Sequence, residues 1–553
     1  MLLLGMVVVL VAAVTVTASA LKGGNAGPAS SDSAACHDAP TLALHVSVAP
    51  EIAPAVQQVS DSWQKAGAKA DGKCVQVVLT RAEPSVAEQQ LSTSSAGTSM
   101  WIPDASLWAR QLSSATAGET GNTTKVTIGH SLANSPLVVV ASPAKASSLA
   151  AHAPGWAALL GGALNLPNPL TSAVGALTLL TGDTLNSDVV SQANTALVAT
   201  MAKLSHETLA TPAAGFDALA ATPDSQALFT ASEQSVIAQN KAKGGVFAAA
   251  VYPTEGSLAL DYPVVELSHP QDDPAVSKAV DAFEQRLRSA PAQRAYHALG
   301  FRSADGEPPE GVIPGVGAPL PMPTPDRALD VIRLWRATVE DTNLLLAIDV
   351  SGSMLEPAGN GKSKIQVAAD AFLTGGSFIP DTSKLGLWVF SSNQTATTPW
   401  AQLVAPGLMS ARVGDGTRRD AIGRAIASMP SRVHGETALY DTTRAAWETM
   451  RADYDPERSN SIVLVTDGQN EYNNSISLAT LLATLKSEYD PKKPIQITTM
   501  GIGRKADKEA LQQISEATHS TSYIVTNAND IRGMFLDVIL HRPCSVNCST
   551  GSP

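Results

Sequence analysis

Apolar residues in the second half of the chain form short continuous runs, separated by longer segments in which they recur at helical spacing. The runs cover 343–349, 385–390, 461–467, 495–502 and 522–526, and the helical segments 364–378, 419–427, 438–454, 478–489, 506–518 and 531–540. Continuous β-branched runs are typical of strands buried on both faces, as in a mostly parallel sheet. The pattern therefore predicts a doubly wound α/β fold, in which ligands bind beyond the carboxyl ends of the strands.

The first half of the chain shows a similar but less regular pattern. Apolar runs at 42–48, 74–80 and 137–141 predict strands. Ile52, Val56, Val59 and Trp63 recur at helical spacing directly after the first of these runs. We therefore expect a second α/β domain.

Breaks in the apolar pattern divide the chain. A Gly/Ser/Ala/Pro-rich segment follows the first apolar run, and a second segment rich in Pro and Gly has no periodicity. The predicted parts are 1–21, a signal peptide or membrane anchor; 22–37, a flexible stalk; 38–302, the first domain; 303–325, an extended linker; 326–542, the second domain; and 543–553, a tail. Such a linker predicts that the two domains are loosely coupled.

The amino-terminal segment is apolar and carries no charge before Lys22. Twenty helical residues extend about 30 Å, enough to cross the core of a bilayer. Ala18-Ser19-Ala20 fits the small-residue pattern that precedes signal peptide cleavage. Both alternatives predict export: an uncleaved helix leaves the protein on the extracytoplasmic face of the membrane, and cleavage releases it.

Charge and cysteine content narrow the classes of partner. The net charge is -12 and there is no cluster of Lys and Arg, which argues against nucleic acid as a ligand. The cysteines allow three pairings, and in an exported protein an even number predicts structural disulfides. We favour Cys36–Cys74 together with Cys544–Cys548.

The loop after the first run of the second domain carries oxygen ligands at alternate positions. Asp349, Ser351 and Ser353 can turn toward one point, since Gly352 lets the backbone bend between them. Carboxylate and hydroxyl oxygens suit Mg²⁺ or Ca²⁺ and do not suit thiolate-seeking metals. Two more oxygen ligands, those of Thr437 and Asp467, are expected at the same edge of the sheet.

This set of residues resembles the metal-ion-dependent adhesion site of von Willebrand factor A domains. Asp349, Ser351 and Ser353 match the family's DxSxS motif, Thr437 its distant threonine and Asp467 its second aspartate. The resemblance implies Mg²⁺, with Mn²⁺ or Ca²⁺ as alternatives, and a protein partner whose carboxylate completes the metal shell. It also implies binding without catalysis. His434, three residues before Thr437, is then expected on the rim and not as a catalytic base.

The first domain resembles type 2 periplasmic solute-binding proteins. The match is closest to exported actinobacterial proteins that join such a domain to a carboxyl-terminal von Willebrand A domain. It rests on Ala49-Pro50-Glu51, the Trp101–Trp108 stretch and Asn168–Gly175. The resemblance implies two lobes, a hinge and a cleft for a small solute. The candidate cleft residues are Glu51, Asp104, Ser106, Thr171, Ser172 and Glu255.

Simpler interpretations exist for several of these residues. Trp63, Trp101 and Trp108 fit a hydrophobic core better than a ligand platform, because large aromatic residues are mostly buried. Asp104 and Glu255 are compatible with roles that support the fold, and Ser172 with capping of a helix. The cleft residues are thus less well supported than the metal ligands.

Together these features predict an exported, membrane-tethered, non-enzymatic binding protein. It binds a protein partner through Mg²⁺ in one domain and a small solute in the other. Two alternatives remain: the solute receptor of an ABC importer, and a chelatase-like scaffold subunit. The absence of a GxxxxGK[ST] nucleotide-binding loop disfavours the scaffold alternative.

Overall fold

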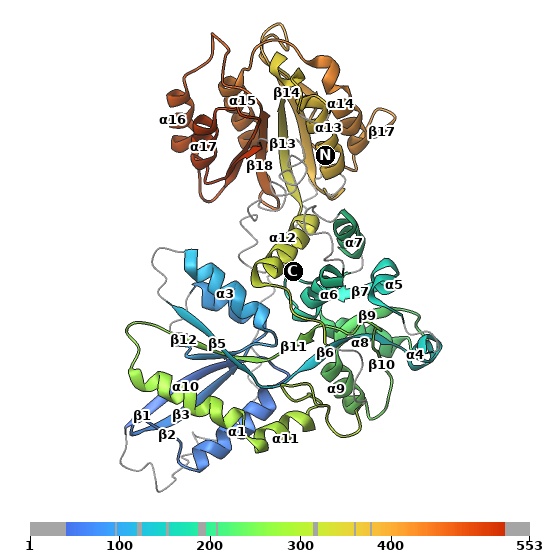
Figure 1. The fold of residues 1–553 in the computed structure, drawn as a ribbon, viewed down its shortest axis with the longest axis vertical. Coiled ribbons are helices and arrows are strands. Elements are labelled where there is room, and N and C mark those ends of the chain that lie inside the picture. Colours follow the sequence, from blue (N-terminus) through green and yellow to red (C-terminus); the bar gives the residue numbers. More distant parts are fainter. Residues whose placement is uncertain are drawn as a thin grey trace, which may run out of the picture.

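The computed structural model describes residues 40–525, except 94–96, 119–123, 151–153, 186–194, 206–207, 313–318, 359–360 and 377–378. Figure 1 shows a lower body with two lobes and an upper body built on one sheet. The predicted amino-terminal helix, stalk, last helix and tail lie outside the described residues. Among the residues that are described, no helix has the length and apolar character needed to cross a membrane.

Lobe 1 is a six-stranded sheet with strand order β2-β3-β1-β4-β12-β5. Its strands are β1 (Thr41–Val48), β2 (Lys69–Ala70), β3 (Lys73–Arg81), β4 (Met100–Ile102), β5 (Lys125–Ser131) and β12 (Pro263–Ser268). Its helices are α1 (Ala53–Lys65), α2 (Pro84–Thr93), α3 (Ser106–Gly118), α10 (Pro274–Leu287) and α11 (Ala290–Ala298). β1 is parallel to β3 and β4, so the loops that follow these strands meet at one edge.

Lobe 2 has a second sheet with strand order β10-β6-β9-β7-β8, and β11 pairs with β6. Its strands are β6 (Ser135–Ala141), β7 (Leu164–Pro167), β8 (Thr208–Leu209), β9 (Leu228–Ser232), β10 (Ala249–Val251) and β11 (Ala259–Leu260). Its helices are α4 (Pro143–Ala150), α5 (Trp156–Gly161), α6 (Ala173–Leu185), α7 (Thr195–Ser205), α8 (Pro212–Ala221) and α9 (Glu233–Lys243).

The chain passes between the lobes after β5 and again after β11, which makes these two connections the hinge. A third link follows α11, where Arg302 forms a β-bridge with Asn134 and a buried ion pair with Glu233 of α9. The Arg302 Nε donates to Glu233 Oε2 over 2.7 Å. A buried bidentate pair of this kind fixes geometry as well as charge. The first domain therefore has the two-lobed architecture predicted for it.

The upper body is one six-stranded sheet with strand order β15-β14-β13-β18-β19-β20, parallel except for β15. Its strands are β13 (Thr342–Asp349), β14 (Lys384–Phe390), β15 (Trp400–Val404), β18 (Ser459–Thr466), β19 (Ile495–Ile502) and β20 (Ser522–Val525). A hairpin of β16 (Arg412–Val413) and β17 (Gly416–Thr417) and short helices η1 (Gly352–Leu355) and η2 (Met429–Arg432) lie in its loops. The longer helices are α13 (Lys364–Gly376), α14 (Arg418–Ser428), α15 (Leu439–Ala452), α16 (Leu478–Glu488) and α17 (Lys508–Glu516).

Both faces of this sheet are covered by helices, which explains why its strands are continuous apolar runs. Leu344, Leu346 and Ile348 of β13 pack with α13 and α14, whereas Leu345 and Ala347 pack with α15, α16 and α17. Alternate residues of a strand point to opposite faces, so every position of β13 must be compatible with burial. The doubly wound fold predicted for this domain is confirmed.

One helix changes the predicted domain boundary. Residues 326–339, assigned to the second domain from the sequence, belong to α12 (Pro325–Val339), whose apolar side joins the core of the two-lobed domain. Trp335 is 1% exposed within that core. The 303–325 segment therefore connects α11 to α12 within the two-lobed domain. The residues that lead into β13 are those after α12.

Candidate functional site

The predicted metal ligands come from three loops at one edge of the upper sheet. Asp349 is the last residue of β13, and Asp467 directly follows β18. β13 and β18 are adjacent and parallel, with Ile348 opposite Val465, so their carboxyl ends coincide. Thr437 lies in the loop that leads into α15. The topology therefore brings residues more than a hundred positions apart to one point.

The five side chains form a chain of contacts. The Thr437 hydroxyl is 3.0 Å from Ser351 Oγ and 3.4 Å from Asp349 Oδ2. Ser351 Oγ is 3.2 Å from Ser353 Oγ, which donates to Asp467 Oδ1 over 2.7 Å. The oxygens predicted to bind one ion are thus brought together, and their identity as metal ligands stays a prediction.

Asp349 lies in the interior beneath this cluster and is fully buried. Its Oδ1 accepts the backbone N–H of Ser351, and its Oδ2 accepts the Thr466 hydroxyl over 2.5 Å. Burial, with a smaller contribution from the charge of Asp467, raises the pKa of Asp349 to about 6 against the effect of these hydrogen bonds. A carboxylate in this position is stabilised by any cation that approaches it.

Gly468 leaves room in front of the hydroxyl groups. A Cβ at this position would lie 3.1 Å from Thr437 Oγ1 and 3.9 Å from Ser353 Oγ. In the described parts of the chain no group of three His, Cys, Asp or Glu side chains is placed to hold a metal ion, and the donors at this cluster are three hydroxyls and two aspartates. This donor set fits a hard cation such as Mg²⁺.

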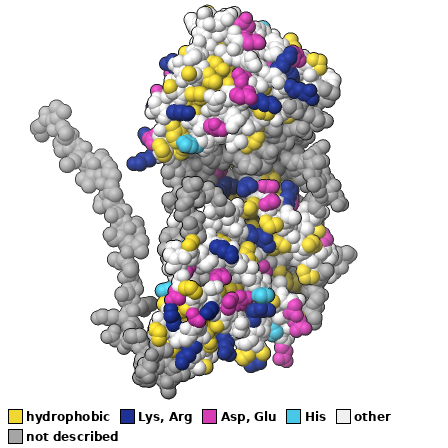
Figure 2. Space-filling view, turned by 60° about the vertical axis from the view of Figure 1, so that its left-hand side comes forward, with side chains coloured by type: hydrophobic (Ala, Val, Ile, Leu, Met, Phe, Trp, Pro, Cys, Tyr) yellow, Lys and Arg dark blue, Asp and Glu magenta, His cyan; other side chains and the backbone are white. Residues whose placement is uncertain are grey.

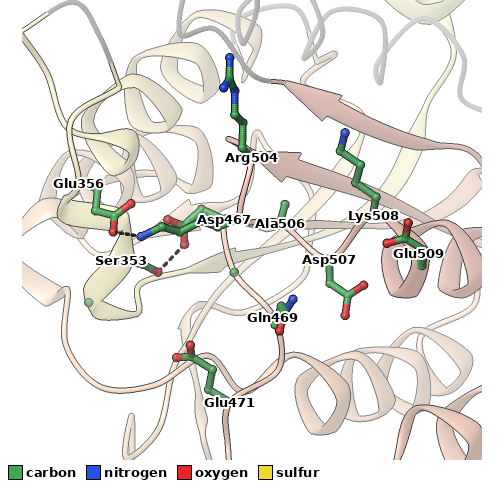
Figure 3. Close-up of a pocket in the computed structure, with 13 residues that line it drawn as sticks. Ser353, Glu356, Asp467, Gln469, Glu471, Arg504, Ala506, Asp507, Lys508 and Glu509 are labelled. Atoms are coloured by element: carbon green, nitrogen blue, oxygen red, sulfur yellow. Dashed lines mark hydrogen bonds and ion pairs between the residues drawn. The ribbon is translucent and has the colours of Figure 1, made fainter.

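A pocket of about 800 Å³ opens beside the cluster and includes Ser353 and Asp467 in its lining. Thr437 and Ser351 are each 1% exposed, whereas Ser353 is only half-buried. Figure 3 shows Glu356 on one side of Ser353 and Asp467, and Arg504 and Lys508 on the other. The site is therefore accessible from the side of Ser353.

His434 lies on the rim of the site, as predicted. It is exposed, its backbone N–H donates to Val350 O, and its Nε2 is 3.3 Å from Gln394 Nε2. Among the described residues its ring contacts this amide and none of the five candidate ligands. Its position gives no geometric support for a role as a base.

Three residues of the site were not identified from the sequence. Thr466 donates to Asp349, and the Lys364 ammonium is 2.6 Å from Asp467 Oδ2 and 2.8 Å from Glu356 Oε2. Thr466 directly precedes Asp467 in the sequence, which is a local signal for its place. Lys364 and Glu356 carry no such signal, because their contacts depend on how α13 packs.

The lobe 1 candidates for solute binding meet near the hinge. Asp104 accepts the indole N–H of Trp108 over 2.8 Å, and the backbone N–H of Ser106 donates to Asp261 Oδ1 over 2.7 Å. Burial raises the pKa of Glu51 to about 6 and that of Asp104 well above its ordinary value. Asp104 and Ser106 thus already have structural partners.

Tyr262 was not identified from the sequence and lies beside this group. Its φ is +42°, and its buried hydroxyl has no hydrogen-bond partner among the described residues, which is also true of Glu51 Oε2. Burial, together with the charges of Glu51 and Asp104, raises the pKa of Tyr262 well above its ordinary value. The hinge therefore holds unsatisfied polar groups, which are rare in protein interiors.

The lobe 2 candidates are distributed over two loops. The Thr171 hydroxyl donates to Asn168 O over 3.4 Å, and the Ser172 backbone N–H donates to the same carbonyl over 2.9 Å, just before α6. Glu255 is exposed and accepts the Trp156 backbone N–H at the start of α5. Glu255 therefore supports the fold, and solute contacts of all three residues stay predictions.

Other predicted features can be located in the structure. The core interpretation of Trp63, Trp101 and Trp108 is confirmed, with exposures of 7%, 0% and 2%. Cys74 is buried near the start of β3 and is disulfide-bonded. Its predicted partner Cys36 lies outside the described residues, as do Cys544 and Cys548, so both pairings stay predictions.

The two bodies correspond to two known domain families. Residues 44–302 match the family model for a bacterial extracellular solute-binding protein, and residues 343–536 match that for the von Willebrand factor type A domain. The chain therefore joins a solute-binding domain to a carboxyl-terminal von Willebrand factor A domain. The second match begins after α12, in agreement with the boundary that the structure gives.

Individual proteins show the same likeness. The chain is 24% identical over 518 residues to the uncharacterized protein Rv1836c of Mycobacterium tuberculosis, covering 85% of this chain and 72% of that one. Iron-bound HitA from Pseudomonas aeruginosa is 13% identical, with a TM-score of 0.40 and coverage of 53% and 98%. A von Willebrand factor type A protein from Catenulispora acidiphila is 21% identical, with a TM-score of 0.27 and coverage of 36% and 42%.

Proposed function

We propose that this chain is an exported, membrane-tethered, non-enzymatic binding protein. Its von Willebrand factor A domain binds a protein partner through a divalent cation, Mg²⁺ in the first place. Its solute-binding domain binds a small solute. The match of residues 44–302 to an extracellular family supports export, and both families are binding modules.

One observation carries the metal part of the proposal. Asp349, Ser351, Ser353, Thr437 and Asp467 come from three loops, yet their oxygens form one connected cluster that opens on the side of Ser353. Buried carboxylates are stabilised by hydrogen bonds and by a cation, and this cluster already supplies the hydrogen bonds around one point where a cation can be held. Hard oxygen donors of this kind favour Mg²⁺ over softer metals.

The partner is expected to supply a carboxylate. Three of the five candidate ligands are neutral hydroxyls, so a cation with one open coordination position would act as a Lewis acid toward an oxygen of the partner. Ser353 faces the pocket through which such a group can approach. The far side of the pocket carries exposed Arg504 and Lys508 together with Asp507 and Glu509, so the cation itself would provide the main attraction for a carboxylate.

The metal part is tested by the thermal stability of the purified full chain in Mg²⁺ and in EDTA. A ligand at a hundred times its Kd stabilises a domain of this size enough to raise the melting temperature by about 5–10 °C. Gly468→Ala should abolish that rise, because its Cβ would enter the space before Thr437 Oγ1.

The control is Gly352→Ala, in the same cluster of loops. Gly352 does not have a positive φ, so the bend expected from the sequence does not require glycine, and its Cβ would lie 3.7 Å from Gly435 O, an ordinary contact; the response to Mg²⁺ should therefore be retained. An unchanged melting temperature of the unmodified chain on addition of Mg²⁺ or Mn²⁺ would rule the metal function out.

A second candidate function is the solute receptor of an ABC importer. It is favoured by the extracellular solute-binding match and by the two-lobed fold. A thermal-shift screen of the full chain against nutrients should then give one solute that binds with a Kd in the micromolar range or below. A screen without any hit counts against this function and leaves the metal function untouched.

A further inference from the structure

Lys364, the first residue of α13, is a buried cation at the candidate metal centre. Its side chain is 9% exposed, and its ammonium contacts Asp467 Oδ2 and Glu356 Oε2 at 2.6 and 2.8 Å. Lysine is seldom buried unless paired, so this position depends on the two carboxylates. The contacts of Lys364 raise its pKa, against the effect of burial, and the side chain stays charged.

The two oxygens of Asp467 are divided between two donors. Oδ1 accepts the Ser353 hydroxyl, and Oδ2 accepts the Lys364 ammonium. Asp467 itself is fully buried, so the charge of Lys364 is compensated where solvent screens it little. A divalent cation that binds beside Ser353 must therefore share Asp467 with a positive charge that is already there.

We propose that Lys364 is a positioning residue that tunes the metal centre. By holding Asp467 it weakens the binding of the divalent cation, and it also stabilises the acidic cluster when no cation is bound. This inference rests on the proposed metal function. A weaker, exchangeable cation suits a site whose role is to be completed by a partner.

The test compares Lys364→Gln with Lys362→Gln in the full chain. Glutamine at 364 can still donate a hydrogen bond to Asp467 but removes the charge. Lys362 lies two residues away, is 52% exposed and pairs with the exposed Asp370, so its change controls for general loss of charge. The probes are MgCl₂ and MnCl₂ alone, titrated by calorimetry, and the melting temperature in EDTA.

We expect Lys364→Gln to bind Mg²⁺ about tenfold more tightly, since one repulsive charge is removed at close range. The melting temperature of Lys364→Gln in EDTA should fall. Lys362→Gln should change the Mg²⁺ affinity by less than about twofold and the melting temperature by less than about a degree. Equal or weaker binding by Lys364→Gln, with binding by the unmodified chain intact, overturns the inference. Binding by none of the three proteins overturns the proposed metal function instead.

A separate observation concerns α12, which contacts both lobes of the solute-binding domain. It packs against α6 and α7 of lobe 2 and against α3 of lobe 1, and Figure 1 shows it lying across them beneath the von Willebrand factor A domain. Val331, Ile332 and Trp335 are its buried side chains in the shared core. Hinge motion of the lobes would have to separate α12 from one of them.

Charged residues strengthen the same arrangement. Arg327 forms a bidentate pair with Asp183 of α6, with Nε 2.9 Å from Oδ2. Toward the other end of α12, Arg336 lies close enough to Glu88 of α2 to oppose the rise in pKa that burial causes there. One end of the helix is thus linked to lobe 2 and the other to lobe 1.

The junction with the next domain is short. α12 ends at Val339 with Glu340 as its carboxyl cap, and β13 begins at Thr342. Asp341, between them, accepts the Thr382 hydroxyl. A helix that leads into a central strand through two residues leaves little freedom for rotation.

We infer that α12 is a strap that fixes the two lobes of the solute-binding domain in one arrangement, next to the short junction with the von Willebrand factor A domain. The test places spin labels at Gln57→Cys in lobe 1 and Asp217→Cys in lobe 2, both exposed. Pulsed EPR on the full chain should give one narrow distance distribution. Arg327→Ala, alone and combined with Trp335→Ala, should broaden it or add a second distance.

Arg333→Ala is the matched control, because Arg333 lies on the same helix, is 46% exposed and pairs with the exposed Asp330. It should leave the distribution narrow. If both Arg327→Ala and the double variant, checked for folding by circular dichroism, also keep the narrow distribution, the strap is disproved.

Discussion

At the residue scale, the candidate metal centre depends on a glycine as much as on its oxygen donors. Gly435 has a φ of +77°, and its carbonyl accepts the Gly352 backbone N–H over 3.0 Å. A Cβ on Gly435 would lie 2.5 Å from Ser392 Oγ. Gly435 therefore ties the loop of Thr437 to the loop of the two serines.

We predict that Gly435→Ala weakens Mg²⁺ binding by about tenfold or more, although this residue supplies no side-chain oxygen. The left-handed backbone and the close contact together cost about 1–3 kcal/mol, and relief of that strain moves Thr437. Titration calorimetry measures the effect. Gly414→Ala is the control, since its φ of +60° gives similar strain with nothing within 4 Å of the Cβ; equal affinities in the two variants would contradict the prediction.

A second prediction at this scale concerns pH. The pKa of Glu51 is raised to about 6 by burial, with the charge of Glu83 adding to the rise. A carboxyl with a raised pKa favours the folded state while protonated, and this contribution is lost as pH rises through about 6. The penalty above that pH is about 2 kcal/mol.

Glu51→Gln should therefore raise the free energy of unfolding at pH 8 by up to about 2 kcal/mol and have little effect at pH 4. Urea unfolding at both pH values measures this. Glu83→Gln, at the neighbouring exposed carboxyl, should give a much smaller gain. A gain that is the same at pH 4 and pH 8 would show that the effect does not arise from ionisation.

At the scale of elements, close packing between α6 and β7 sets the shape of lobe 2. A Cβ on Gly175 would lie 2.0 Å from Pro167 O, so only glycine allows α6 to approach β7 this closely. The turn that holds Thr171 and Ser172 lies between these two elements. The fold of this predicted solute-binding loop thus depends on a helix position outside it.

We predict that Gly175→Ala lowers the free energy of unfolding by about 1–3 kcal/mol, the usual cost of overpacking. Gly161→Ala in α5, whose Cβ would meet nothing within 4 Å, should have little effect. Urea denaturation with separate probes for the two domains measures both. Equal stability of the two variants would mean that α6 can shift without cost.

The elements themselves were largely predictable from the sequence. β13 reads as a buried strand because both its faces are covered, and its boundaries agree with the predicted 343–349 to one residue. The candidate ligands Asp349 and Asp467 lie at the carboxyl ends of predicted parallel strands, so the sequence also predicted that they lie at one edge of the sheet. The local pattern of apolar residues was sufficient to predict an element wherever that pattern reflects burial of the element.

Tertiary contacts were not predictable in this way. The spacing of Val331 and Trp335 marks α12 as amphipathic, but nothing local says which domain its apolar side meets. Lys364 reaches Asp467 across about a hundred residues, and Glu255 accepts from Trp156 at a similar separation. Single-sequence reasoning sees the chemistry of such residues and not their partners.

At the scale of the whole molecule, the structure changes the expected relation between the domains. A flexible linker at 303–325 predicted loose coupling, whereas α12 belongs to the solute-binding domain and continues into β13 through two residues. The connection between the solute-binding domain and the von Willebrand factor A domain is therefore the two residues between α12 and β13. The candidate metal centre lies at the carboxyl end of β13, the end away from this junction.

The surface suggests how a partner is recognised. Figure 2 shows positive and negative side chains interspersed over one face of the molecule. A mixed surface gives weak long-range steering, so recognition depends on short-range contacts. Under the proposed function, a divalent cation at the candidate metal centre would provide a contact of that kind.

The most direct measurement is a calorimetric titration of the full chain with MgCl₂, before and after Thr437→Val. Valine has nearly the same shape as threonine but removes the hydroxyl, and Thr437 is 1% exposed. Thr443→Val is the control, because Thr443 is equally buried in α15 and its hydroxyl only donates to Leu439 O. We predict saturable Mg²⁺ binding by the unmodified chain and by Thr443→Val, and its loss in Thr437→Val; equal binding by all three, or by none, would contradict the account.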